Sequence, residues 1–235
     1  MNSLKTNFLI SIVLLLLLCW SCGQEPQPAA AATSKPAAAA TVAVDSTKPA
    51  RKKARIIFFG DSLTAGYGLD EQYSFPSLIQ DKIDSLGLNY EVVNAGLSGE
   101  TSAGGINRID WVMEQPVDVF ILELGGNDAL RGFDLATTRT NLQGILDKVK
   151  AKYPTAQLIV AGMEAPPNMG SAYAREFRTI YQKLATDNHA ALIPFLLADV
   201  GGIPTLNLAD RIHPNEQGQV IVAGNVWRVL GEVLK

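Results

Sequence analysis

From Arg55 onward, short apolar runs rich in β-branched residues alternate with longer segments of helical periodicity. The short runs predict strands at residues 55–59, 90–94, 117–123, 157–162 and 191–193. The longer segments predict helices at residues 74–86, 102–113, 135–153, 172–188 and 215–234. The strands are apolar on both faces, which is typical of a parallel sheet covered by helices. The pattern therefore predicts one three-layer α/β/α domain, residues 55–235, built on a doubly wound five-stranded parallel sheet.

The start of the chain has the pattern of a bacterial export signal. Lys5 supplies a positive charge, and residues 8–18 form an almost unbroken apolar core. That core is short for a membrane-spanning helix and is followed by small residues, so it fits a removable signal better than an anchor helix. We therefore expect a signal peptide over residues 1–22.

The end of this signal resembles a lipobox, in which a small residue precedes the cysteine that becomes the lipid-bearing N-terminus. Ser21 takes the small position and Cys22 the lipidated one. The resemblance implies a lipoprotein of the bacterial cell envelope, held to the membrane by its N-terminal lipid. Gly23 after the cysteine is similar to the pattern that sorts lipoproteins to the outer membrane. A conventional secreted protein, with Cys22 merely near the cleavage site, is the alternative.

Residues 23–54 are rich in Ala, Pro, Thr, Ser and Gln and carry no periodic apolar pattern. Such a segment buries too little surface to offset its ordering entropy, so it predicts a disordered tether. Basic residues at 51–53 and at Arg55 lie at its end. They predict a solvated leader to the first strand, with a contact to a lipid surface as the alternative.

Charge and cysteine content narrow the range of partners. The net charge of −3, without a visible basic face, argues against nucleic acid. The only two cysteines, Cys19 and Cys22, precede the domain, which therefore has no disulfide and no cysteine-based metal site. No feature of the sequence predicts an obligate protein partner.

Polar residues follow the predicted strands at the points where ligands bind a parallel sheet, outside its carboxyl ends. Ser62 follows the first strand, Gly99 the second and Asn127 the third. Asp210 and His213 come from the loop before the last helix. A hydroxyl, an imidazole, a carboxylate and an amide at one edge are the components of acyl transfer by a serine nucleophile.

Ser62 and His213 each allow a second interpretation. Ser62 is either the nucleophile or a cap of the following helix, whose free N–H groups would stabilise an oxyanion. Asp210 precedes His213 by three residues, which lets its carboxylate reach Nδ1 while Nε2 points at the serine. A loop histidine beside a capping aspartate is the alternative. His189 lies at the end of a predicted helix, where a cation favours the dipole, and we assign it no chemistry.

The remaining polar residues of the edge have structural alternatives as well. Asn127 is either an amide donor to an oxyanion or a turn residue, and Gly99 either presents its N–H or only makes a turn. Asp61 and Asp128 are interpreted as anchors of turns through backbone N–H groups. Glu123, at a strand end, is a candidate for a partly buried carboxylate that supports the site, and the sequence leaves its role open.

Four blocks together resemble those of the SGNH (GDSL-type) hydrolases: Gly60-Asp61-Ser62-Leu63, Gly99, Gly125-Gly126-Asn127-Asp128 and Asp210-x-x-His213-Pro214. The similarity is to the bacterial periplasmic thioesterase/lysophospholipase and arylesterase branch. It implies a flavodoxin-like fold and hydrolysis of esters or thioesters without metal or cofactor. It also implies a triad of Ser62, Asp210 and His213, and an oxyanion hole formed by Ser62, Gly99 and Asn127.

The substrate implied by this resemblance is a small-molecule or lipid acyl ester. Leu63, Leu97, Pro166 and Pro167 are candidates for the substrate pocket, the two prolines lying in a loop after the fourth strand that could also be a plain connector. The same catalytic groups would serve an envelope acyl- or acetyltransferase or a carbohydrate deacetylase. A non-catalytic lipoprotein that binds a glycan or lipid is the remaining alternative.

Overall fold

The computed structural model describes residues 52–234. The predicted signal peptide, the lipidation site at Cys22 and nearly all of the predicted tether lie outside the described residues. The first strand begins at Ala54, one residue before the predicted start of the domain.

The five strands form one parallel sheet in the order β2-β1-β3-β4-β5. Their bounds are β1 Ala54–Gly60, β2 Tyr90–Gly96, β3 Val119–Glu123, β4 Gln157–Ala161 and β5 Ala191–Ile193. After β1 the chain adds β2 on one side and then crosses to add β3 on the other, so the sheet is doubly wound. The predicted fold class is confirmed, and the reversal of direction beside β1 is where such sheets bind ligands.

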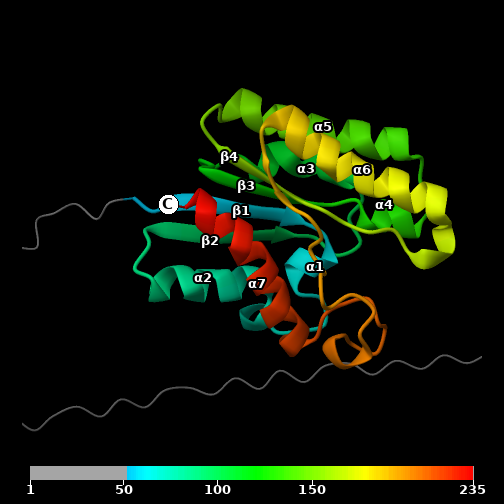
Figure 1. Cartoon of the computed structure of the whole chain (residues 1–235). Helices are drawn as coiled ribbons and strands as arrows, with labels where there is room; N and C mark the ends of the chain where they lie inside the picture. Colours follow the sequence, from blue (N-terminus) through cyan, green and yellow to red (C-terminus); the bar gives the residue numbers. More distant parts are fainter. Residues whose placement is uncertain (1–51, 235) are drawn as a thin grey trace, which may run out of the picture. The chain divides into compact units, whose positions relative to one another are not determined.

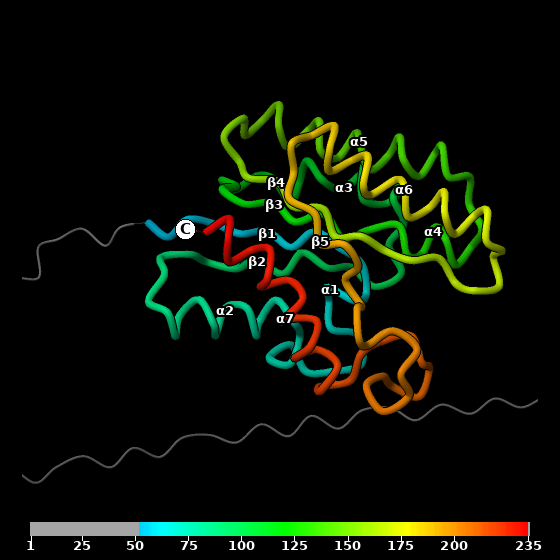
Figure 2. The backbone as a smooth tube through the Cα atoms, in the orientation of Figure 1, coloured from blue at the N-terminus to red at the C-terminus, as the bar shows by residue number. Residues whose placement is uncertain are grey.

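Within the described residues, five helices of eleven or more residues cover the two faces of the sheet (Figures 1 and 2). On one face lie α2 (Phe75–Ser85) and α7 (Glu216–Val233), which pack against each other. On the other lie α3 (Ser102–Val112), α5 (Leu135–Lys152) and α6 (Ser171–Asn188). Within residues 52–234, none of the helices is long and apolar enough to cross a bilayer.

The predicted strands and helices agree with the observed ones except near their ends. The four side chains of residues 56–59 in β1 are at most 1% exposed, because helices cover both faces of that strand. Ser74 and Asn215, included in the predicted helices, are N-caps whose side chains accept hydrogen bonds from Ser77 and Gly218 backbone N–H groups. The predicted third strand began at Val117, which is buried but precedes the first β1–β3 pair at Val119.

Several short elements had no predicted bounds, although the sequence suggested a helix directly after Ser62. They are α1 (Ser62–Ala65), α4 (Gly126–Leu130) and the 3-10 turns η1 (Glu71–Tyr73), η2 (Pro167–Met169) and η3 (Pro204–Leu206). Each is too short to show a helical period in the sequence. Two of them, α1 and α4, begin at the carboxyl edge of the sheet beside the predicted polar residues.

Candidate active site

Ser62 lies at the point where β1 ends and α1 begins. Gly60 at the end of β1 is in register with Gly96 of β2 and Glu123 of β3, so three strands deliver their following loops to one place. Asp61 is the N-cap of α1, and its Oδ1 accepts a hydrogen bond of 3.0 Å from the Leu63 N–H. The capping position considered for Ser62 is therefore taken by Asp61, and the Ser62 hydroxyl has another partner.

That partner is His213, in the loop before α7. The distance from Ser62 Oγ to His213 Nε2 is 2.8 Å, and the distance from His213 Nδ1 to Asp210 Oδ2 is 2.7 Å. A carboxylate only accepts hydrogen bonds, so Asp210 places the ring proton on Nδ1 and leaves Nε2 to accept from the serine. The geometry is that of a neutral imidazole ready to remove the hydroxyl proton.

Asp210 is itself held by the loop that carries His213. Its Oδ1 accepts hydrogen bonds from the backbone N–H groups of Ile212, at 2.9 Å, and His213, at 3.1 Å. Desolvation raises the pKa of Asp210, but the hydrogen bonds from the His213 ring and from these two N–H groups outweigh it and lower the pKa to about 2. Asp210 is therefore ionised throughout the neutral range.

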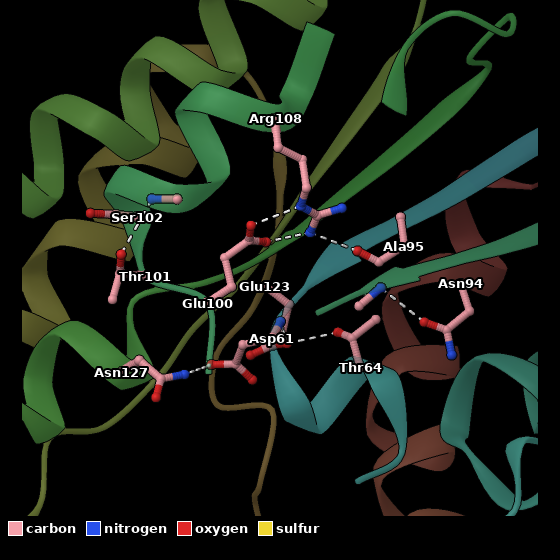
Figure 3. Close-up of polar contacts among 12 residues, drawn as sticks. Asp61, Thr64, Asn94, Ala95, Glu100, Thr101, Ser102, Arg108, Glu123 and Asn127 are labelled. Carbon is pink, nitrogen blue, oxygen red and sulfur yellow. Dashed lines mark hydrogen bonds and ion pairs between the residues drawn. The ribbon is translucent and has the colours of Figure 1, made fainter. Parts of the chain in front are cut away.

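The three predicted oxyanion donors, Ser62, Gly99 and Asn127, lie at the same edge and line one cavity with His213. Ser62 is the first residue of α1, so its N–H has no acceptor within the helix. Gly99 has a φ of +80°, a conformation that side chains rarely adopt, and an added Cβ would enter open space. Asn127 is in the first turn of α4, and its Nδ2 donates a hydrogen bond of 3.1 Å to Asp61 Oδ2 (Figure 3).

An ion pair between Glu100 and Arg108 holds the loop that carries Gly99 (Figure 3). Arg108 Nε donates to Glu100 Oε1 at 2.7 Å, Nη2 contacts the other carboxylate oxygen, and Nη2 also donates to the Ala95 carbonyl at 2.9 Å. The guanidinium lies 4.3 Å from the centre of the Phe59 ring. Because Glu100 directly follows Gly99, this largely buried ion pair restrains the loop that carries Gly99.

Asp128 joins the turn after β3 to the neighbouring helices. Its carboxylate accepts from the Ser102 N–H at 2.8 Å, the Ser102 hydroxyl at 2.5 Å and the Thr138 hydroxyl at 3.1 Å. As predicted, Asp128 accepts a hydrogen bond from a backbone N–H group. That N–H group belongs to Ser102 at the start of α3, however, and not to the turn that contains Asp128.

Glu123, whose role the sequence left open, is buried beneath α1. Its Oε2 accepts from the Asp61 N–H at 3.1 Å and the Thr64 hydroxyl at 2.7 Å, while Oε1 has no hydrogen-bond partner. Gly60 leaves the space for this contact, since an added Cβ would lie 2.3 Å from Glu123 Oε2. Burial, and then the charge of Asp61, raise the pKa of Glu123 well above its ordinary value of 4.5.

The cavity beside Ser62 has a volume of about 540 Å³. Of the predicted pocket residues, Leu63, Pro166 and Pro167 line it, whereas Leu97 does not and is half exposed. Side chains that the sequence did not single out complete the apolar wall: Met163, Phe195, Leu197 and Ile212. No local pattern marks them, because they come from separate loops at the same edge.

Tyr67 lines the cavity beside the catalytic histidine candidate, whereas His189 does not. The Tyr67 ring lies over the His213 ring, with 4.4 Å between their centres, although the sequence indicated no role for it. Its sequence signal is its place in the phrase Ala65-Gly66-Tyr67, which follows the Ser62 block. His189 is the C-cap residue of α6, at a left-handed φ of 53°, and is not among the residues that line the cavity.

Comparison with known proteins agrees with this geometry. The model of the GDSL-like lipase/acylhydrolase family matches residues 58–221. The chain belongs to this family. It is 37% identical over 180 residues to Esterase TesA of Pseudomonas aeruginosa, covering 76% of this chain and 89% of that protein. It is 38% identical over 169 residues to thioesterase 1/protease 1/lysophospholipase L1 of Escherichia coli K12, covering 72% of this chain and 79% of that protein.

A crystal structure of TesA superposes with a TM-score of 0.73 at 37% identity, covering 77% of this chain and 99% of that chain. The chain is thus a GDSL-type carboxylic ester hydrolase with the SGNH fold. Within residues 52–234, no group of three or more His, Cys, Asp or Glu side chains is arranged to hold a metal ion.

Proposed function

We propose that this enzyme hydrolyses small-molecule or lipid acyl esters and thioesters through an acyl-serine intermediate. The observation that carries the proposal is the chain of two hydrogen bonds, 2.8 Å and 2.7 Å long, from Ser62 through His213 to Asp210. In this proposal Ser62 is the nucleophile, His213 the general base and acid, and Asp210 the group that orients the imidazole.

In the first half-reaction, His213 Nε2 takes the hydroxyl proton while Ser62 Oγ attacks the carbonyl carbon. The carbonyl electron pair moves to oxygen, which receives hydrogen bonds from the N–H groups of Ser62 and Gly99 and from the Asn127 amide. The intermediate collapses, the bond to the alcohol or thiol breaks, and His213 gives its proton to that leaving group. The acyl group remains on Ser62.

In the second half-reaction, His213 removes a proton from water, and the resulting hydroxide attacks the acyl carbon. The same donors hold the second oxyanion. When the bond to Ser62 Oγ breaks, His213 returns the proton to the serine and the carboxylic acid leaves. One ester and one water become one alcohol and one acid, and the enzyme is regenerated.

The apolar walls of the cavity support a substrate with an apolar acyl chain. Each buried methylene contributes about 0.8 kcal/mol, or roughly fourfold in kcat/KM, for as long as the chain contacts these walls. Relatives named an esterase and a thioesterase/lysophospholipase support esters and thioesters of this kind. We expect kcat/KM for 4-nitrophenyl esters to rise from acetate to butyrate and hexanoate.

We also propose that the mature enzyme is a lipoprotein of the bacterial cell envelope, anchored through Cys22. The support is the sequence pattern alone, with Ser21 before the cysteine and an apolar run too short to span a membrane. Cys22→Ala should abolish labelling by a fatty-acid analogue and release the protein from the membrane fraction. Labelling and membrane retention that match the wild type would contradict the anchor.

The acyl-serine is tested with 4-nitrophenyl butyrate in a rapid-mixing experiment. The wild type should release a burst of nitrophenol, and mass spectrometry of the quenched enzyme should find a butyryl group on Ser62. Ser62→Ala should retain less than about a thousandth of the turnover. A butyryl group on another residue, or turnover without Ser62, would refute the mechanism. Butyryl transfer to an added alcohol in preference to water would identify a transferase instead.

A further inference from the structure

Asp61 has a contact that the proposed mechanism does not use. Its side chain is almost fully buried, at 2% exposure, and its two oxygens join two different elements. Oδ1 accepts from the Leu63 N–H in α1 at 3.0 Å, and Oδ2 accepts from Asn127 Nδ2 in α4 at 3.1 Å. Figure 3 shows the two side chains pointing toward each other from these helices.

The contact decides which end of the Asn127 amide is a donor on the cavity side. The two ends of an asparagine amide have nearly the same shape, but the nitrogen donates and the oxygen accepts. An ionised carboxylate only accepts, so it selects the nitrogen end. Nδ2 carries two N–H groups; Asp61 takes one, and the other is left for the cavity that Asn127 lines.

We propose that Asp61 is a positioning residue that orients the Asn127 amide for oxyanion stabilisation, and that only its ionised form does so. The inference rests on the proposed function, since the donor role of Asn127 belongs to it. When Asp61 is protonated, its oxygens no longer both accept, and the amide loses the partner that distinguishes its two ends.

Glu123 and Thr64 fix the backbone on which Asp61 lies. The Asp61 N–H and the Thr64 hydroxyl both donate to the same oxygen, Glu123 Oε2. The N-cap and the third residue of α1 are thereby tied to the end of β3. Since α4 follows β3 within three residues, this link also sets the separation between Asp61 and Asn127.

Three titratable groups act on Asp61 from the surrounding elements. They are Glu123 at the end of β3, Glu100 in the loop after β2, and His213 in the loop before α7. Burial raises the pKa of Asp61 to about 6, against the hydrogen bonds from Leu63 and Asn127 and the charge of His213. Glu100 raises that pKa further, although its charge is paired with Arg108.

Asp61 is ionised at neutral pH, since its pKa is about 6. Burial and the charge of Asp61 raise the pKa of Glu123 well above its ordinary value of 4.5. As pH falls through about 6, Asp61 takes up a proton. The donor geometry at Asn127 is lost in the same range.

A double-mutant cycle with Asp61→Asn and Asn127→Ala tests this inference. Asparagine keeps the capping ability but is not an anion, so α1 retains its N-cap. We expect Asp61→Asn to lower kcat about 10–100-fold, the scale of a mispositioned group, with KM within about twofold of the wild type. Asn127→Ala should lower kcat about 10²–10³-fold. In the Asn127→Ala background, Asp61→Asn should cost less than about twofold, because the amide it positions is gone.

Asp134→Asn is the matched control, since Asp134 caps α5 through the Thr137 N–H and is not among the residues lining the cavity. It should leave kcat unchanged. Effects of Asp61→Asn and Asn127→Ala that multiply in the double variant would overturn the inference. Such a result, in an enzyme that still forms the butyryl-serine, would leave the proposed function intact; absence of that adduct in the wild type would instead refute the proposed function.

A second measurement does not depend on the folding of Asp61→Asn. In the wild type, log(kcat/KM) should fall more steeply as pH drops through about 6 than it does in Asn127→Ala, because kcat/KM reports the free enzyme. Protonation of Asp61 can disturb the amide only in the protein that still has it. Equal slopes in the two proteins would overturn the requirement for an ionised Asp61.

Discussion

Removal of Arg108 is expected to destabilise the domain by several kcal/mol, because it leaves a buried carboxylate without its partner. The Glu100 side chain is 3% exposed and that of Arg108 19%. Arg108→Met keeps much of the side-chain volume over the Phe59 ring but removes the contacts to Glu100 and the hydrogen bond to the Ala95 carbonyl. Breaking a buried pair from one side costs about 3–5 kcal/mol.

Thermal unfolding followed by circular dichroism measures this loss. For a domain of this size, about 2–4 °C is lost per kcal/mol, so Arg108→Met should lower Tm by about 6–20 °C. Turnover should fall as well, because Glu100 follows Gly99 in the loop that presents a proposed oxyanion donor.

Arg55 provides the matched control, because its side chain is also 19% exposed. Its partner Glu91, however, is 50% exposed, so Arg55→Met should cost less than about 1 kcal/mol. In a second test, Glu100→Gln added to Arg108→Met should recover part of the lost stability, since no uncompensated charge remains. Equal losses in Arg108→Met and Arg55→Met, or no recovery in the double variant, would refute the reasoning.

Three further predictions concern the site. His213→Asn should abolish turnover, whereas His189→Asn should leave it nearly unchanged; the reverse result in an ester assay would refute the triad. Tyr67→Ala should lower kcat by loosening the imidazole that the ring covers, 4.4 Å away, and Tyr67→Phe should keep it; equal losses would point to the hydroxyl instead. Because the native pKa of Glu123 is raised, its contribution to stability is complete below about 4.5 and is lost as pH rises through the native value. The unfolding free energy of the wild type relative to Glu123→Gln, measured in urea from pH 4.5 to 8, should therefore fall with pH, and a constant difference would contradict this.

The alternation of strands and helices was readable from the sequence because it depends on short-range sterics and burial. Runs buried on both faces, such as residues 56–59, need no partner to be recognised as strands of a covered sheet. The convergence of Ser62, Gly99 and Asn127 also followed, since parallel strands end at one edge. The observed strand and helix ends differ from the predicted ones by one or two residues. Ser74, for example, was predicted to be helical but is an N-cap with an extended backbone.

Contacts between distant segments required the tertiary structure. The bond from Asn127 to Asp61 spans 66 residues and exists because Gly60 and Glu123 are in register. The hydrophobic periodicity of the sequence does not predict this register, because the register depends on how the whole sheet packs against its helices. Packing likewise decided that Leu97 lies outside the cavity. Sequence determined which groups reach the edge of the sheet, whereas tertiary packing determined which of them touch, because hydrogen bonds act only over about 3 Å.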